Sequence, residues 1–257
     1  MNDLSPVSDA FPLIGDITDP ETWPTQVRQA LEAARETFDV WFNDRPAKSA
    51  KAFNRAYAAL VDVAKPNAIR GWHCTRLLDR EVQAIKENGM EVLTPNLVQR
   101  RVNSAVLHGD LVSAVGARLI AAHQARSQYR IGQLWFIFDD TPSEDAVERL
   151  LRQWGGEAIY WAHEADQEVA PILRRIGRPC LVEAIIPVSS LHPQFGLVEA
   201  LVKNDLMTSG LLDGIPRGFE GYCDRNLPSQ FIQQIWLHPD PEFVKRVRSD
   251  LWRTPLA

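Results

Sequence analysis

The sequence predicts an α+β fold, in which helices and short strands are mixed without regular β-α-β alternation. Two observations indicate this class. Apolar residues recur at three- and four-residue steps through several long segments, as they do on one face of a helix. Short apolar runs such as 179–187 are typical of buried strands. At 257 residues the chain suits one large domain, or one domain with an extension.

The N-terminal part reads as two amphipathic helices. After a loosely structured lead-in (residues 1–19), Asp19-Pro20 is typical of a helix start, and an apolar stripe then runs to Asn43. Arg45-Pro46 breaks this helix, and a second one covers residues 49–64. We expect residues 1–67 to form an N-terminal helical extension that carries no chemistry, and residues 68–257 to form the main domain.

The stretch from Ala68 to Leu93 organises the rest of the chain. An apolar run reaches His73 and Thr75, a helical segment follows, and Asn88-Gly89 ends that helix before an extended segment. Side chains two apart on a strand point to the same face, so His73 and Thr75 can act on one ligand. The alternative interpretation is a core histidine packed beside Trp72.

Further elements follow the same patterns along the chain. We expect helices over residues 107–126, 144–154 (with Ser143 as its cap), 164–176 and 195–206, strands over 133–138, 179–187, 218–223 and 231–237, and a turn at 139–142.

Composition excludes several classes of protein. With 28 basic and 33 acidic residues the net charge is −5, so the chain has no overall charge pattern for binding nucleic acid or anionic membranes. Three widely spaced cysteines argue against a disulfide framework and a zinc site. The N-terminus lacks a signal pattern, and no run of 18 apolar residues occurs. We expect no membrane partner, and a cytosolic location or delivery to another cell by secretion without a signal.

Three separated motifs, taken in order, resemble the ADP-ribosyltransferase fold, in the His-Tyr-Glu branch shared by poly-ADP-ribose polymerases and diphtheria-type toxins. Trp72-His73-Cys74-Thr75 followed by Gly89-Met90 resembles the family's His-Gly-Ser/Thr strand and later Gly-Leu, with Cys74 in place of the usual Gly. Residues 156–162 (GEAIYWA) are similar to the family's Gly-x-Gly-Ile-Tyr-Phe-Ala. Residues 219–222 (FEGY), before LPSQFI, resemble the setting of the catalytic glutamate.

This resemblance covers about residues 68–238 and implies a split β-sheet core that uses NAD as co-substrate. It implies that Glu220, His73 and Tyr160 are catalytic: Glu220 stabilises the oxocarbenium-like ribose, His73 holds the adenine-side ribose, and Tyr160 stacks on nicotinamide. These three side chains should then line one cleft. The NAD-binding set is His73, Cys74, Thr75, Arg76, Gly89 and Tyr160. The family's second nicotinamide-stacking tyrosine has no obvious match.

Several alternatives stay open. Glu183, inside the most apolar strand, competes with Glu220 as the catalytic carboxylate, although motif order favours Glu220. Arg76 either pairs a diphosphate oxygen or is an exposed arginine at a helix start. The function implied is transfer of ADP-ribose to a macromolecular acceptor, protein or nucleic acid, as toxins and effectors do. Other functions are a catalytically silent binding module, an NAD glycohydrolase and an RNA 2′-phosphotransferase. No role requires a metal.

Overall fold

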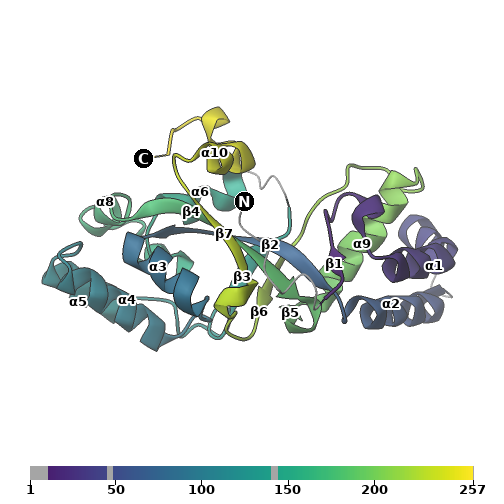
Figure 1. Cartoon of the computed structure of the whole chain (residues 1–257), viewed down its shortest axis with the longest axis horizontal. Helices are drawn as coiled ribbons and strands as arrows, with labels where there is room; N and C mark the ends of the chain where they lie inside the picture. The colour runs from purple at the N-terminus through teal and green to yellow at the C-terminus, as the bar shows by residue number, and fades with distance from the viewer. Residues whose placement is uncertain (1–10, 45–48, 140–143, 257) are drawn as a thin grey trace. The chain divides into compact units, whose positions relative to one another are not determined.

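The computed structural model describes residues 11–44, 49–139 and 144–256 (Figure 1). The expectations for residues 1–10, for the break at Arg45-Pro46 and for the turn and cap at 140–143 lie outside these residues. The chain forms two compact units. The first unit comprises residues 1–72, 135–140 and 184–222, and the second comprises 73–134, 141–183 and 223–257. Each is described by itself.

The described elements are mostly those that the periodicities predict. The helices of eight residues or more are α1 (Thr25–Asp44), α2 (Ala50–Ala64), α3 (Asp79–Asn88), α4 (Pro95–Leu107), α5 (Ser113–Ala121), α6 (Glu144–Arg152) and α9 (Gln194–Thr208). Shorter ones are α7 (Glu157–His163), α8 (Val169–Leu173) and α10 (Pro241–Val247). The strands are β1 (Leu13–Ile14), β2 (Ala68–Leu77), β3 (Leu134–Ile137), β4 (Arg178–Pro187), β5 (Leu191–His192), β6 (Glu220–Cys223) and β7 (Ile232–Leu237).

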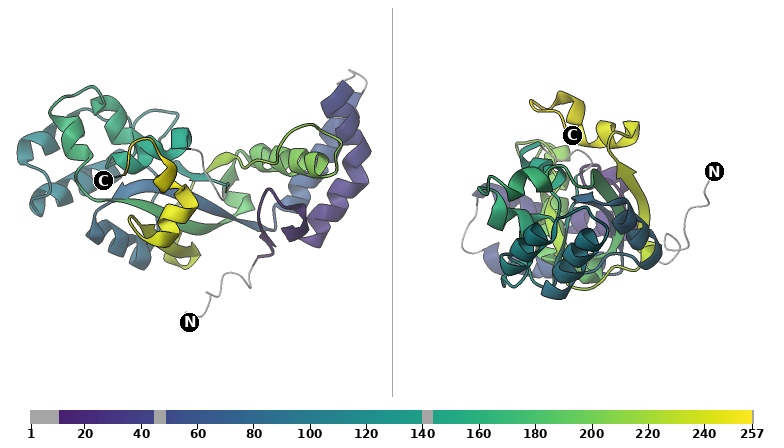
Figure 2. Two further views of the ribbon diagram at one scale, coloured as in Figure 1. Left: turned by 90° about the horizontal axis from the view of Figure 1, so that it is seen from above. Right: turned by 90° about the vertical axis from the view of Figure 1, so that its left-hand side faces the viewer.

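In the first unit the helices α1, α2 and α9 lie together, as both Figure 1 and Figure 2 show. Asp19 accepts a hydrogen bond from the Glu21 N–H, but it caps a separate 3-10 helix (Pro20–Thr22). The long helix α1, which the sequence predicts to start at this cap, begins only at Thr25. The guanidinium of Arg35 on α1 forms two hydrogen bonds, of 3.0 and 2.9 Å, to the carboxylate of Asp205 on α9. This paired geometry fixes how α1 packs on α9.

The strands of the first unit follow the order β5-β6-β3-β2-β4, and β1 pairs in parallel with β2. β2 and β3 are antiparallel, with Trp72 opposite Ile137. The Val188 N–H donates to the Asn67 carbonyl, so the end of β4 lies beside the start of β2 and these strands are antiparallel too. A mixture of helices with a mainly antiparallel sheet confirms the expected α+β character.

In the second unit the strand order is β2-β4-β7. Its core is a cluster of buried side chains from α4, α5, α7 and α8 and from segments between helices; it includes Ile159, Leu173 and Trp154, which follows α6. The Glu81 carboxylate accepts hydrogen bonds from the Leu78 N–H (2.8 Å) and the Arg101 Nε (2.7 Å) at the start of α3. The helix α3 is therefore anchored at its first turn.

The sequence interpretation of residues 94–126 was wrong. One helix was expected over 107–126, whereas the chain forms α4 and then α5, with a break at 108–112. The Thr94 hydroxyl accepts a hydrogen bond from the Leu97 N–H and caps α4, with Pro95 at its first position. The polar run at 99–101 concealed this helix. No helix in the described part of the chain is long and apolar enough to cross a membrane.

Candidate functional site

The histidine of the first motif lies where the sequence places it, on a strand. His73 is half-buried on β2. Its neighbours Cys74 and Thr75 are each 4 % exposed. Of these three side chains, His73 therefore has the most surface available to a ligand.

Arg76 belongs to the same strand, not to the start of a helix. It is 4 % exposed, and its Nε donates a hydrogen bond of 2.8 Å to the Ile176 carbonyl. Burial lowers the pKa of this guanidinium. The interpretation of Arg76 as an exposed arginine at a helix start was therefore wrong, because β2 continues to Leu77. Its pairing with a diphosphate stays a prediction.

Gly89 ends α3 as predicted, with a φ of 83°. A Cβ added at this position would lie 2.0 Å from the Leu227 carbonyl oxygen. Met90 and Leu227 exchange two backbone hydrogen bonds of 2.8 Å beside it. The space beside this glycine, where the resemblance would place NAD, is thus filled by the backbone at Leu227.

Tyr160 follows two glycines of positive φ, Gly155 and Gly156, and lies on α7, which they precede. The sequence resemblance expects a helix to open here. The ring is 2 % exposed within the core cluster of the second unit, and this burial raises the pKa of its hydroxyl. A ring so placed offers almost no face to a ligand, whereas the next residue, Trp161, is 48 % exposed.

Glu183 lies on β4 and is 9 % exposed. The Trp236 indole N–H on β7 donates a hydrogen bond of 3.4 Å to its Oε2. The carboxylate therefore has a donor within its own unit, which provides a structural reason for a glutamate in an apolar strand.

Glu220 is the first residue of β6, and its side chain is exposed. The residue before it, Phe219, stacks on Phe138 with ring centroids 4.5 Å apart and an interplanar angle of 10°. The Phe138 N–H donates a hydrogen bond of 2.9 Å to the Phe219 carbonyl. A packed backbone thus holds an exposed carboxylate at the beginning of a strand.

Three rings lie side by side on β5, β6 and β3, and we call them the ring row: His192, Tyr222 and Trp135. The Tyr222 ring centroid is 5.6 Å from that of His192 and 5.0 Å from that of Trp135. Trp135 is 43 % exposed. Glu220 and Tyr222 are two residues apart on β6, so they share a face of the sheet. Sequence reasoning missed this row because its members come from three segments.

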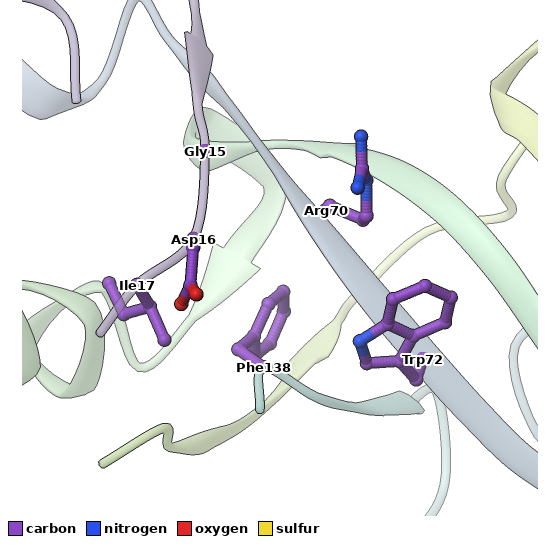
Figure 3. Close-up of a pocket in the computed structure, with 6 residues that line it drawn as sticks. All are labelled: Gly15, Asp16, Ile17, Arg70, Trp72 and Phe138. Atoms are coloured by element: carbon purple, nitrogen blue, oxygen red, sulfur yellow. The ribbon is translucent and has the colours of Figure 1, made fainter. Parts of the chain in front are cut away.

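A hollow of about 80 Å³ lies in the first unit, beside the first half of β2 (Figure 3). Six residues line it: Gly15, Asp16, Ile17, Arg70, Trp72 and Phe138. Sequence reasoning does not find this hollow, because residues 15–17 fall within the loosely structured lead-in that it predicts.

The predicted site residues are divided between the two units. Glu220 belongs to the first, and the others, from His73 to Glu183, belong to the second. Their convergence on one cleft stays a prediction. Within the described residues, no group of three or more His, Cys, Asp and Glu side chains is placed to hold a metal ion. Comparisons of this chain with family models, curated proteins and solved structures gave no match.

Proposed function

We propose that the protein is an NAD-dependent ADP-ribosyltransferase, built on an ADP-ribosyltransferase-like core, that modifies a macromolecular acceptor and releases nicotinamide. The observation that carries the proposal is the exposed Glu220 carboxylate at the start of β6, on the same face as the Tyr222 ring. A carboxylate beside an aromatic surface suits a substrate that joins a flat ring to a sugar on which positive charge develops.

In the proposed reaction the bond between the ribose C1′ and the nicotinamide nitrogen breaks, and nicotinamide keeps the electron pair. Positive charge then develops on the ribose, as it does in glycoside cleavage, and the Glu220 carboxylate stabilises it. A nucleophilic atom of the acceptor bonds to C1′ and loses its proton. His73 contributes by holding the adenine-side ribose through a hydrogen bond. The motif context supports these roles, since His73 lies on a strand and Glu220 opens one.

A second candidate is the catalytically silent binding module. The burial of Tyr160 and the occupied approach at Gly89 favour it, because two positions assigned to NAD are used instead in packing. This module would keep the fold and bind a nucleotide or a protein without turnover.

Incubation of the protein with NAD labelled in its adenylate part and with a cell lysate tests both candidates. The transferase predicts nicotinamide release together with label on a macromolecule, and Glu220→Gln should lower the rate by about 10²–10³-fold. Glu36→Gln, the same change at an exposed position of α1, is the control and should leave the rate unchanged. Nicotinamide release without labelled acceptor would indicate the glycohydrolase. NAD binding without turnover would support the silent module.

A further inference from the structure

The hollow beside β2 lies where two strand pairings leave a stretch of β2 between them. β1 pairs with β2 at Ala68 and Ile69, and β3 pairs with it at Trp72. After β1 the chain continues through Gly15, Asp16 and Ile17, which line the hollow together with Phe138 from the end of β3 (Figure 3). The hollow is therefore bordered by β2 and by the segments that directly follow β1 and β3.

The segment that carries Asp16 is held in place from several sides. The Trp23 indole N–H donates a hydrogen bond of 2.8 Å to the Asp16 carbonyl, and the Asn204 side-chain amide donates one of 2.8 Å to the Ile17 carbonyl. Asn204 is itself 2 % exposed on α9. A site built on such a segment needs little rearrangement to bind a ligand.

Only one of the two oxygens of the Asp16 carboxylate accepts hydrogen bonds from described residues. Its Oδ1 accepts hydrogen bonds from the Thr18 N–H (2.8 Å) and hydroxyl (2.7 Å), which fix the orientation of the side chain. Within the described residues its Oδ2 accepts no hydrogen bond. Figure 3 shows this carboxylate on the side of the hollow that Phe138 also borders.

The other residues that line the hollow determine which hydrogen-bond donor can reach Asp16 Oδ2. Trp72 and Phe138 also line the hollow, and because each is only 2 % exposed they close it on their side with apolar atoms and leave little open ring face. Arg70 is exposed, and Figure 3 shows its guanidinium directed away from the Asp16 carboxylate. Among cations with N–H donors, guanidinium is flat and more weakly hydrated than ammonium, so its transfer to such a hollow costs less.

We infer that this hollow binds a guanidinium group, with Asp16 Oδ2 as the acceptor and the Trp72 and Phe138 rings as the apolar walls. A volume of about 80 Å³ admits the planar tip of an arginine side chain or of a small guanidino compound. The inference does not depend on the proposed transferase activity.

Nuclear magnetic resonance of the ¹⁵N-labelled full-length protein tests this inference with methylguanidinium as probe. We expect saturable shifts of the Gly15 and Ile17 amides and of the Trp72 indole N–H. Methylammonium should bind several-fold more weakly, and acetate should cause no such shift. Tripeptides of Gly-Arg-Gly and Gly-Lys-Gly distinguish a side chain from a free compound, since only a side-chain site binds the arginine peptide as tightly as methylguanidinium.

Asp16→Asn is the informative variant, because asparagine keeps Oδ1 for Thr18 but replaces Oδ2 with an N–H₂ donor. It should weaken methylguanidinium binding at least about tenfold while the rest of the spectrum is retained. Asp213→Asn makes the same change at an exposed residue of the same unit and should leave binding unaltered. Absence of a saturable shift, equal binding by Asp16→Asn, or preferential binding of acetate would overturn the inference.

Discussion

The indole N–H of Trp154 donates a hydrogen bond of 2.8 Å to the Glu81 carboxylate, joining residues 73 positions apart in the second unit. Arg101 pairs with the same carboxylate, and its guanidinium carbon lies 5.0 Å from the centre of the Trp154 ring. Glu81 is thus the common acceptor for the start of α3, for α4 and for the segment after α6.

Replacing Glu81 with glutamine should destabilise the protein by about 2–4 kcal/mol, because it leaves a largely buried Arg101 without its counter-charge. Urea unfolding followed by circular dichroism measures this difference. Glu91→Gln removes a carboxylate from an exposed pair with Arg100 and should cost no more than about 1 kcal/mol. An equal loss of unfolding free energy in the two variants would contradict the claim that burial makes the Glu81 pair the stronger one.

The pH dependence of stability should reflect the same carboxylate. Burial alone would raise the pKa of Glu81, but the Arg101 charge and the hydrogen bonds from Arg101, Leu78 and Trp154 hold it below its usual value. The stabilisation is therefore present above the pKa of the unfolded chain, about 4.3, and is lost as the pH falls through the lower folded value. Urea midpoints between pH 6 and 3 should fall less steeply in Glu81→Gln than in the wild type.

Gly89→Ala should cost more than the same change at another glycine of positive φ. Gly89 has a φ of 83° and a ψ of −162°, a conformation nearly exclusive to glycine. An alanine held in it would cost about 1–3 kcal/mol of backbone strain, and its Cβ would also collide with the Leu227 carbonyl. At Gly109 (φ 79°) a Cβ meets no atom within 4 Å, so only a backbone cost of about 1–2 kcal/mol is expected. Thermal unfolding of both variants provides the comparison, and a milder effect at Gly89 would be the contrary result.

The thiols should be unreactive in the folded protein. Cys74, Cys180 and Cys223 are buried, and burial raises the pKa of the Cys180 thiol and raises that of Cys223 to about 12. We expect slow reaction with a thiol-specific disulfide reagent at pH 8, and rapid reaction of all three after unfolding in guanidinium chloride. A fast-reacting thiol in the native protein would mean that one of these sites opens readily.

Two variants separate the proposed roles of His73 and Glu220. His73→Ala should weaken NAD binding and also lower turnover, because its role is to hold the dinucleotide in the ground state. Glu220→Gln should leave NAD affinity nearly unchanged while the rate falls, since its carboxylate acts mainly in the transition state. Calorimetric NAD affinity and nicotinamide release are measured for each variant. An equal loss of affinity in both would refute this division of roles.

Local patterns predicted much of the secondary structure. The apolar run at 179–187, interrupted only by Glu183, predicted β4, and the Asn88-Gly89 pair predicted the end of α3, because both signals depend on neighbouring residues only. The same reasoning failed at α4, where polar residues cover the exposed face and the buried side chains, such as Val98 and Val102, are few. A helix with a narrow apolar stripe is difficult to recognise from its sequence.

By itself, then, the sequence determined the α+β class, most helices and strands, and the placing of His73 on one strand and Glu220 at the start of another. Tertiary structure alone decided which side chains are accessible. It buried Tyr160 and left Trp161 exposed, although they are neighbours on one helix. It also assembled the ring row and the Asp16 hollow from segments far apart in the chain. Burial and long-range contact depend on how elements pack, and no short-range periodicity records that packing.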